Sequence, residues 1–296
     1  MDGLGVTLRG LTVRYGRTVA LDGVDLDIRA RTITGLLGRN GSGKTTAASV
    51  IAAFRRPSAG TVLVGGEDPW ENEAVAPHVL LVRESGDVLD DERLSVNLDY
   101  TAGARPFFSR EVAERLLDTF ELDPATKPRA LSRGQRSAFG IVQAIAARAP
   151  LTILDEVHLG LDAPSRYAFY DALLADYVDH PRTIVLSSHL IDEVERLLED
   201  VVVLHRGRVL LTVDAESLRA QGIAVTGPTA AVDAFVAGRR TLGRQRLGGA
   251  SQVTVLGVVD DESAAVARAT GLDLGPVPLQ DLFVHLTAGE PAGEEA

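Results

Sequence analysis

The fold is decided by the stretch Gly38-Arg39-Asn40-Gly41-Ser42-Gly43-Lys44-Thr45-Thr46. It matches the phosphate-binding pattern G-x-x-x-x-G-K-[ST]. An apolar segment, 33–37, precedes the loop and a helix-forming segment, 45–54, follows it, which is the strand–loop–helix context of that motif. Glycines let the backbone present a row of N–H groups, and a helix N-terminus adds a positive dipole end. The stretch therefore predicts a nucleotide phosphate site, with Lys44 on the β- and γ-phosphates and Thr45 on Mg²⁺.

Composition excludes several other classes of site and partner. The 296 residues carry a net charge of −11 with pI near 5.0, which argues against a broad nucleic-acid surface, so we expect no nucleic acid partner. The absence of cysteine excludes disulfides and thiolate metal sites. No apolar run approaches the ~18 residues that a membrane span needs, and residues 1–10 do not resemble a signal peptide.

Apolar segments alternate with helical patterns along residues 1–215, which predicts an α/β domain with a mostly parallel sheet covered by helices. The expected buried strands are 33–37, 79–82, 151–154 and 183–186. The expected helices are 45–54, 109–120, 132–148, 164–178 and 190–198. Segments 6–15, 21–28 and 61–64 alternate apolar and polar residues as an antiparallel edge does, and 201–204 with 208–213 is expected to form a closing hairpin.

Residues 216–296 are expected to form a small C-terminal α+β domain. Their pattern follows the order β-α-β-β-α-β, which is that of a ferredoxin-like split βαβ unit, with a short last helix at 279–286. An irregular cap packed on the main domain is the alternative. Residues 290–296 have the composition of a disordered acidic tail.

Four further elements are candidates for the same site. Asp155 and Glu156 end a buried strand, where one carboxylate can serve a metal and the other can orient or deprotonate water. Ser132 is placed as the N-cap of a helix in the segment 131–135. Asp162 lies in a loop, and His189 follows the strand 183–186. Taken singly, each has a structural explanation as a cap, a surface residue or part of an ion pair.

Together these motifs resemble the ATP-binding subunit of ATP-binding-cassette (ABC) transporters over about residues 4–213. Walker A corresponds to 38–46, the signature to 131–135, Walker B with its glutamate to 151–156, the D-loop to 160–162, and the switch histidine to His189. Tyr15 falls where the family places an aromatic that stacks on adenine. The resemblance implies the P-loop NTPase fold of an ABC ATPase domain, with an antiparallel β edge and a helical subdomain at about 84–148.

The resemblance also implies ATP hydrolysis with ATP and Mg²⁺ as cofactors, in a head-to-tail dimer with a second ATP-binding subunit, expected to be a homodimer. Glu156 would polarise the attacking water and His189 would contact the γ-phosphate. Residues implied in nucleotide contact are Tyr15, Gly38, Arg39, Asn40, Gly41, Ser42, Gly43, Lys44, Thr45, Thr46, Ser132, Gly134, Gln135 and Asp162. Residues implied at the metal are Thr45, Asp155 and Glu84.

The function implied is to energise a separate transmembrane permease from the cytoplasmic face of the membrane. The segment 278–287 resembles the tail of exporter-type subunits, which favours export. The permease is expected to dock at about 84–108, where Tyr100, Phe107 and Phe108 either line a groove or form helical-subdomain core. Two alternatives stay open: a soluble ATPase of this fold acting on ribosomes or DNA, and a nucleotide-binding regulator with little hydrolysis.

Two positions depart from the family pattern. Glu84 stands where the family usually has a glutamine that senses Mg²⁺ and the γ-phosphate, and Arg133 stands where the signature usually has glycine. We expect these to be compensating departures, with Arg133 of the opposing subunit offsetting the charge of Glu84 in the dimer.

Overall fold

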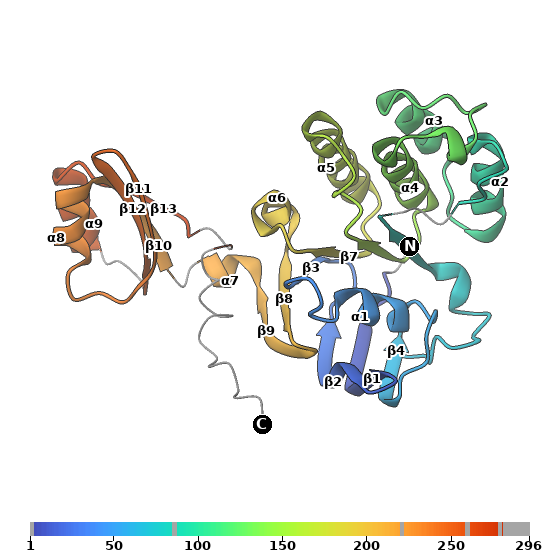
Figure 1. Cartoon of the computed structure of the whole chain (residues 1–296), viewed down its shortest axis with the longest axis horizontal. Coiled ribbons are helices and arrows are strands. Elements are labelled where there is room, and N and C mark those ends of the chain that lie inside the picture. Colours follow the sequence, from blue (N-terminus) through green and yellow to red (C-terminus); the bar gives the residue numbers. More distant parts are fainter. Residues whose placement is uncertain (1–2, 85–87, 220–221, 258–260, 278–279, 281–296) are drawn as a thin grey trace. The chain divides into compact units, whose positions relative to one another are not determined.

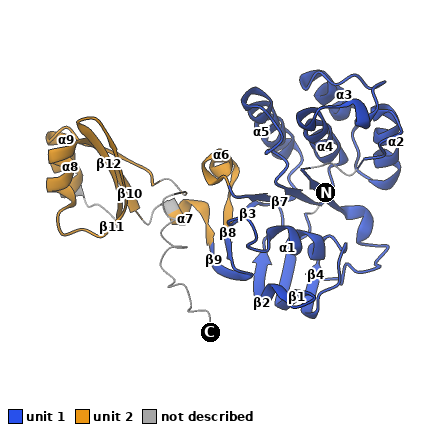
Figure 2. Ribbon diagram, in the orientation of Figure 1, with its two compact units in different colours: residues 1–189, 202–212 blue, residues 190–201, 213–296 orange. Residues whose placement is uncertain are grey.

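The computed structural model describes residues 3–84, 88–219, 222–257, 261–277 and 280. The chain divides into two compact units, residues 1–189 with 202–212 and residues 190–201 with 213–296 (Figure 2). Residues 190–201 group with the second unit, although they lie before residue 215, where the sequence predicts the domain boundary. This grouping by contacts does not test the predicted domain limits, which stay a prediction.

The centre of the fold is a six-stranded sheet in the order β5-β6-β7-β3-β8-β9 (Figure 1). Its strands are β3 (Ile33–Leu37), β5 (Val79–Arg83), β6 (Leu151–Asp155), β7 (Thr183–Ser188), β8 (Asp200–His205) and β9 (Arg208–Asp214). The pairs β5–β6, β6–β7 and β3–β7 are parallel. Every residue of β3, β6 and β7 is buried, as expected of strands covered on both faces. The predicted α/β class is confirmed.

A three-stranded antiparallel sheet stands beside the central one in the order β2-β1-β4. Its strands are β1 (Val6–Tyr15), β2 (Thr18–Ile28) and β4 (Ala59–Val64). Buried Val6, Leu8, Leu11 and Val13 of β1 belong to one hydrophobic core with residues of α1 (Lys44–Ile51). This is the antiparallel edge that the alternating sequence predicted, and it supports the helix that starts at the phosphate-binding loop.

Four longer helices complete the first unit: α2 (Leu94–Ala104), α3 (Arg110–Thr119), α4 (Arg133–Ala147) and α5 (Ala163–Asp179). Helix α4 contacts α2, α3 and α5 (Figure 1). Short 3₁₀ turns lie at Ala76–His78 and Pro128–Ala130. The helices predicted at 109–120, 132–148 and 164–178 are present, whereas α2 was not recognised in the sequence.

The second unit contains a four-stranded sheet in the order β11-β12-β10-β13 with antiparallel pairing throughout. The elements that build it are β10 (Gly222–Pro228), α8 (Thr229–Val236), β11 (Thr241–Leu247), β12 (Ala250–Leu256), α9 (Asp261–Ala269) and β13 (Asp273–Gly275). They follow one another as β-α-β-β-α-β, the order of a split βαβ unit. Its own core contains Val225, Val232, Val253 and Val255.

The second unit also contains α6 (Ile191–Val194), a 3₁₀ turn (Glu195–Leu197) and α7 (Ala215–Arg219). The single helix predicted at 190–198 is therefore an α-helical turn followed by a 3₁₀ turn. The helix predicted at 279–286 and the tail at 290–296 lie outside the described residues, apart from residue 280.

Candidate nucleotide site

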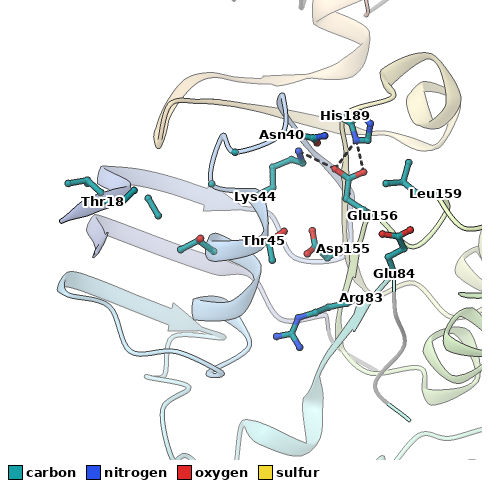
Figure 3. Close-up of a pocket in the computed structure, with 15 residues that line it drawn as sticks. Thr18, Asn40, Lys44, Thr45, Arg83, Glu84, Asp155, Glu156, Leu159 and His189 are labelled. Carbon is teal, nitrogen blue, oxygen red and sulfur yellow. Dashed lines mark hydrogen bonds and ion pairs between the residues drawn. The ribbon is translucent and has the colours of Figure 1, made fainter. Parts of the chain in front are cut away.

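A cavity of about 680 Å³ opens where β3, β6 and β7 end and α1 begins (Figure 3). Because parallel strands deliver their carboxyl ends to one edge, motifs far apart in the sequence meet there. The lining residues are Thr18, Val19, Ala20, Asn40, Gly41, Gly43, Lys44, Thr45, Thr46, Arg83, Glu84, Asp155, Glu156, Leu159 and His189. The cavity thus gathers most of the predicted Walker A residues with both Walker B carboxylates.

The phosphate-binding loop has the backbone form that its glycines predict. Gly43 caps α1 at φ 110°, and a Cβ there would lie 2.6 Å from Leu21 Cδ2. Only glycine satisfies both demands without strain. Gly38 N donates to the Ser188 carbonyl at 3.3 Å, and Ser42 N donates to the Arg39 carbonyl at 3.1 Å. Asn40 and Gly41, which lie in the same loop, are exposed at the cavity. The loop is therefore fixed by these backbone hydrogen bonds, while Asn40 and Gly41 remain accessible from the cavity.

Lys44 is a buried cation held inside the loop, with its side chain 5% exposed. Its Nζ donates to the Gly38 carbonyl at 2.7 Å and lies 3.1 Å from Glu156 Oε1. A buried ammonium needs such partners because desolvation is costly. The same donors can turn to phosphate oxygens, since charge-assisted contacts of this kind are among the strongest available.

Glu156 lies between two donors at the centre of the cavity (Figure 3). Besides Lys44, His189 Nδ1 lies 3.2 Å from Oε1 and 3.1 Å from Oε2. The Glu156 backbone has φ 55°, a left-handed conformation that is unfavourable for a residue with a Cβ. Such outliers persist where surrounding contacts enforce them, and they concentrate at functional sites. Glu156 N donates to Ser187 Oγ at 3.1 Å, which is one such contact.

The residues predicted at the metal fit Mg²⁺ held together with phosphates. Asp155 is buried, and its Oδ1 accepts a hydrogen bond from Ser187 Oγ at 2.5 Å. Asp155, Thr45 and Glu84 all line the cavity. Among the described residues no group of three or more acidic or histidine side chains forms a cage of its own. Mg²⁺ is usually held by one or two carboxylates and substrate phosphates, and Asp155 with the Thr45 hydroxyl offers oxygen atoms of that kind at the cavity.

Sequence reasoning missed three residues behind the cavity. Ser187 and Ser188 directly precede His189, and both are fully buried. Ser187 contacts both Asp155 and Glu156, while Ser188 Oγ lies 3.0 Å from His158 Nε2. The sequence did contain a signal for the two serines. They end one parallel strand, and Asp155 ends its neighbour, so hydroxyl and carboxylate side chains are expected side by side.

The signature segment forms the N-terminus of α4. Ser132 Oγ accepts from Gln135 N at 3.2 Å and Gln135 Oε1 accepts from Ser132 N at 3.0 Å, which is a capping box. A Cβ on Gly134 would lie 2.9 Å from the Gly160 carbonyl, so glycine lets α4 approach the D-loop. Asp162 caps α5 by accepting from Ser165 N at 2.9 Å, and the hydrogen bonds from Ser165 lower the pKa of its carboxyl. The predicted contact residues Ser132, Gly134, Gln135 and Asp162 do not line the cavity.

Glu84 and Arg133 are paired within one chain. Arg133 Nη2 donates to Glu84 Oε1, and the Glu84 carbonyl accepts from Ser137 Oγ at 3.0 Å. This contact joins the signature helix to the cavity wall of the same subunit. The expected compensation across a dimer stays a prediction.

Tyr15 does not line the cavity. It lies at the end of β1, about half exposed, and the Arg55 guanidinium stands 3.7 Å from its ring centroid. Its stacking on adenine stays a prediction, as do the other residue roles.

Comparison with known proteins agrees with the motifs. The ABC transporter family model matches residues 21–158. The daunorubicin resistance ATP-binding protein DrrA3 of Streptomyces coeruleorubidus is 29% identical over the full length of both chains. The aliphatic sulfonates import ATP-binding protein SsuB 2 of Xanthomonas axonopodis pv. citri is 32% identical, covering 71% of each chain. A solved ATP-binding subunit of an ABC transporter superposes with TM-score 0.65 at 26% identity, covering 73% of this chain and 92% of that one.

The protein is thus a P-loop ATPase of the ABC class. It belongs to the ABC transporter family as an ATP-binding subunit, an ATP hydrolase that uses ATP and Mg²⁺. Among the described residues, every helix is too short or too polar to cross a membrane.

Proposed function

We propose that this chain energises a separate membrane permease for export, bound to it at the cytoplasmic face of the membrane. The relative that aligns over its whole length is named for resistance to daunorubicin, a role that export would serve. The observation that carries the ATPase part is the convergence of Lys44 and His189 on Glu156 in one cavity.

The arrangement supports a division of roles among the residues. On nucleotide binding, the Lys44 ammonium would move from Glu156 to the phosphates. The Glu156 carboxylate would then be free to orient the attacking water and to take up a proton from that water. His189, already at hydrogen-bond distance, would hold Glu156 in place. Thr45 and Asp155 would hold Mg²⁺, which when bound neutralises charge on the phosphate oxygens. The step is favoured by positioning and by charge stabilisation in a site partly closed to water.

Dimerisation is proposed from the exposed signature. The Arg133 side chain is 76% exposed, and Asp162 is exposed at the start of α5. Ser132 and Gln135 satisfy each other's backbone groups, so the helix start is formed before any partner arrives. A second copy presenting this surface to the phosphates would complete the site as a homodimer.

The permease would dock in a second hollow of about 510 Å³ in the first unit. Its lining residues are Phe54, Leu80, Leu81, Val82, Val88, Leu89, Asn97, Tyr100, Thr101, Ala104, Arg105 and Gln143. Phe54 and Tyr100 are 61% and 62% exposed, so with the aliphatic lining residues they offer apolar surface to a partner. Tyr100 is thus a groove residue rather than core, whereas Phe107 and Phe108 are not among the lining residues.

Co-purification with a membrane protein encoded beside this gene tests the function. We expect the purified pair in vesicles to hydrolyse ATP faster than the chain alone and to move substrate away from the ATP side. Tyr100→Asp should abolish the association but leave ATP binding intact. Binding to ribosomes or DNA instead, or ATP binding without hydrolysis in the assembled pair, would overturn the proposal in favour of one of the two alternatives.

A further inference from the structure

His158 is a buried imidazole to which the roles above assign nothing. Its side chain is fully buried, and it lies in the segment between Glu156 and Asp162. Its Nε2 lies 3.0 Å from Ser188 Oγ, and its carbonyl accepts from Leu161 N at 3.2 Å. His158 Nδ1 is buried with no hydrogen-bond partner within the described part of the chain, so the polar anchor of the ring there is Ser188.

Ser188 is held through both its backbone and its side chain. Its carbonyl accepts from Gly38 N at 3.3 Å, and its hydroxyl meets His158. It is the last residue of β7 and is bonded directly to His189, whose Nδ1 lies 3.1 Å from Glu156 Oε2. Because hydrogen bonds weaken steeply with distance and angle, a small shift of Ser188 would move the His189 ring out of reach.

His158 acts as a neutral group in this contact. Burial lowers its pKa to about 4, and the nearby charges of Arg166 and His189 lower it further in the same direction. Near neutral pH the ring of His158 therefore carries no charge. A neutral buried imidazole is suited to hold a hydroxyl rather than to shuttle protons.

We propose that His158 is a positioning residue for ATP hydrolysis, which holds His189 against Glu156 through Ser188. The inference rests on the proposed roles of Glu156 and His189. It assigns to the residues between Walker B and the D-loop a task inside their own subunit.

The first experiment compares His158→Ala with His158→Gln in the full chain under saturating MgATP. We expect His158→Ala to lower kcat about tenfold, equal to about 1.4 kcal/mol of activation free energy, with ATP affinity by calorimetry unchanged. Glutamine carries both a donor and an acceptor, so His158→Gln should recover most of kcat. Equal kcat in wild type and His158→Ala, or no recovery with glutamine, would overturn the proposal. His180→Ala, at the end of α5, is the matched control.

The second experiment separates positioning from mere structure. In a His189→Ala background, adding His158→Ala should change kcat by less than twofold, because the residue it positions is gone. If His158→Ala lowers kcat by the same factor in the wild-type and His189→Ala backgrounds, His158 acts independently of His189. If His158→Ala does not fold, Ser188→Ala takes its place in both experiments, because it removes the same contact by deleting a single oxygen atom.

The two levels of failure are distinguishable. Should Glu156→Gln and His189→Ala both hydrolyse ATP normally, the proposed roles themselves are wrong. Should they hydrolyse ATP more slowly than wild type while His158→Ala keeps its kcat, the inference about His158 alone is overturned.

Discussion

Arg133 donates a hydrogen bond to Glu84 within one subunit, which ties the start of the signature helix to the wall of the nucleotide cavity. Both residues are expected departures from the usual family pattern. The Arg133 side chain is mostly exposed, but that of Glu84 is 28% exposed and lines the cavity. The pair therefore places a compensated carboxylate in the cavity proposed for the phosphates, where an unpaired one would repel them.

Arg133→Gln is expected to weaken ATP binding. The substitution leaves Glu84 charged and unpaired near the phosphates, at a cost of up to about 1 kcal/mol for an exposed pair, which is about fivefold in affinity. Calorimetry at low ionic strength is the measurement. In a Glu84→Gln background the same substitution should have little effect. Additivity of the two within about 0.3–0.5 kcal/mol would contradict the coupling.

Lys44→Ala is expected to abolish tight ATP binding. Lys44 offers a buried cation to the phosphates, and a hydrogen bond to a charged group contributes about 1.5–3 kcal/mol, or at least tenfold in affinity. Calorimetry with MgATP checks this, with Lys127→Ala before the second 3₁₀ turn as the control. An unchanged dissociation constant would mean that nucleotide binds elsewhere.

Glu156→Gln is expected to lower kcat at least about 100-fold and to leave ATP bound, since general base catalysis contributes roughly 10²–10⁴-fold. The amide keeps the shape but cannot accept the proton. Size-exclusion chromatography should then show a larger species with ATP than with ADP. Glu114→Gln on the exposed face of α3 is the control. Normal hydrolysis by the Glu156 variant would remove that residue from the catalytic role.

Much of the fold was predictable because its signals are local. The glycine pattern at 38–46 requires a specific backbone, and the buried strands are short continuous apolar runs. Glu156 and His189, 33 residues apart, were placed at one site by the rule that parallel strands end at one edge. The six-stranded sheet confirms that rule.

Other features depend on contacts that the sequence does not display. Helix α2 buries Leu94, Asn97 and Leu98 while Tyr100 points outward, so its apolar stripe is too short to recognise. The pairing of Glu84 with Arg133 arises because α4 packs against β5, a tertiary contact with no local signature. The role of His158 is hidden for the same reason.

Acid is expected to destabilise the first unit through His158. Its pKa is about 4 when folded and about 6.5 when exposed, so between these values the unfolded chain binds a proton that the folded chain does not. Stability is therefore full above pH 6.5 and falls as the pH drops, by about 2 kcal/mol at pH 5. Urea unfolding followed by Trp70 fluorescence at pH 7 and pH 5 measures this. His158→Gln should show a smaller loss, and an equal loss would contradict the assignment.

Asp176→Ala is expected to be the most destabilising of these changes. Asp176 Oδ1 accepts from Arg148 at 2.7 Å and Oδ2 accepts from Arg182 at 2.8 Å, and both Asp176 and Arg182 are almost fully buried. Burial lowers the pKa of Arg182, and Asp176 opposes that shift. Removing the carboxylate leaves a buried cation uncompensated, which costs about 3–5 kcal/mol. Urea unfolding at pH 7 checks this against Asp171→Ala on the same helix. If the two variants unfold at the same urea concentration, Asp176 contributes no more than an exposed carboxylate, and the buried network does not stabilise the fold.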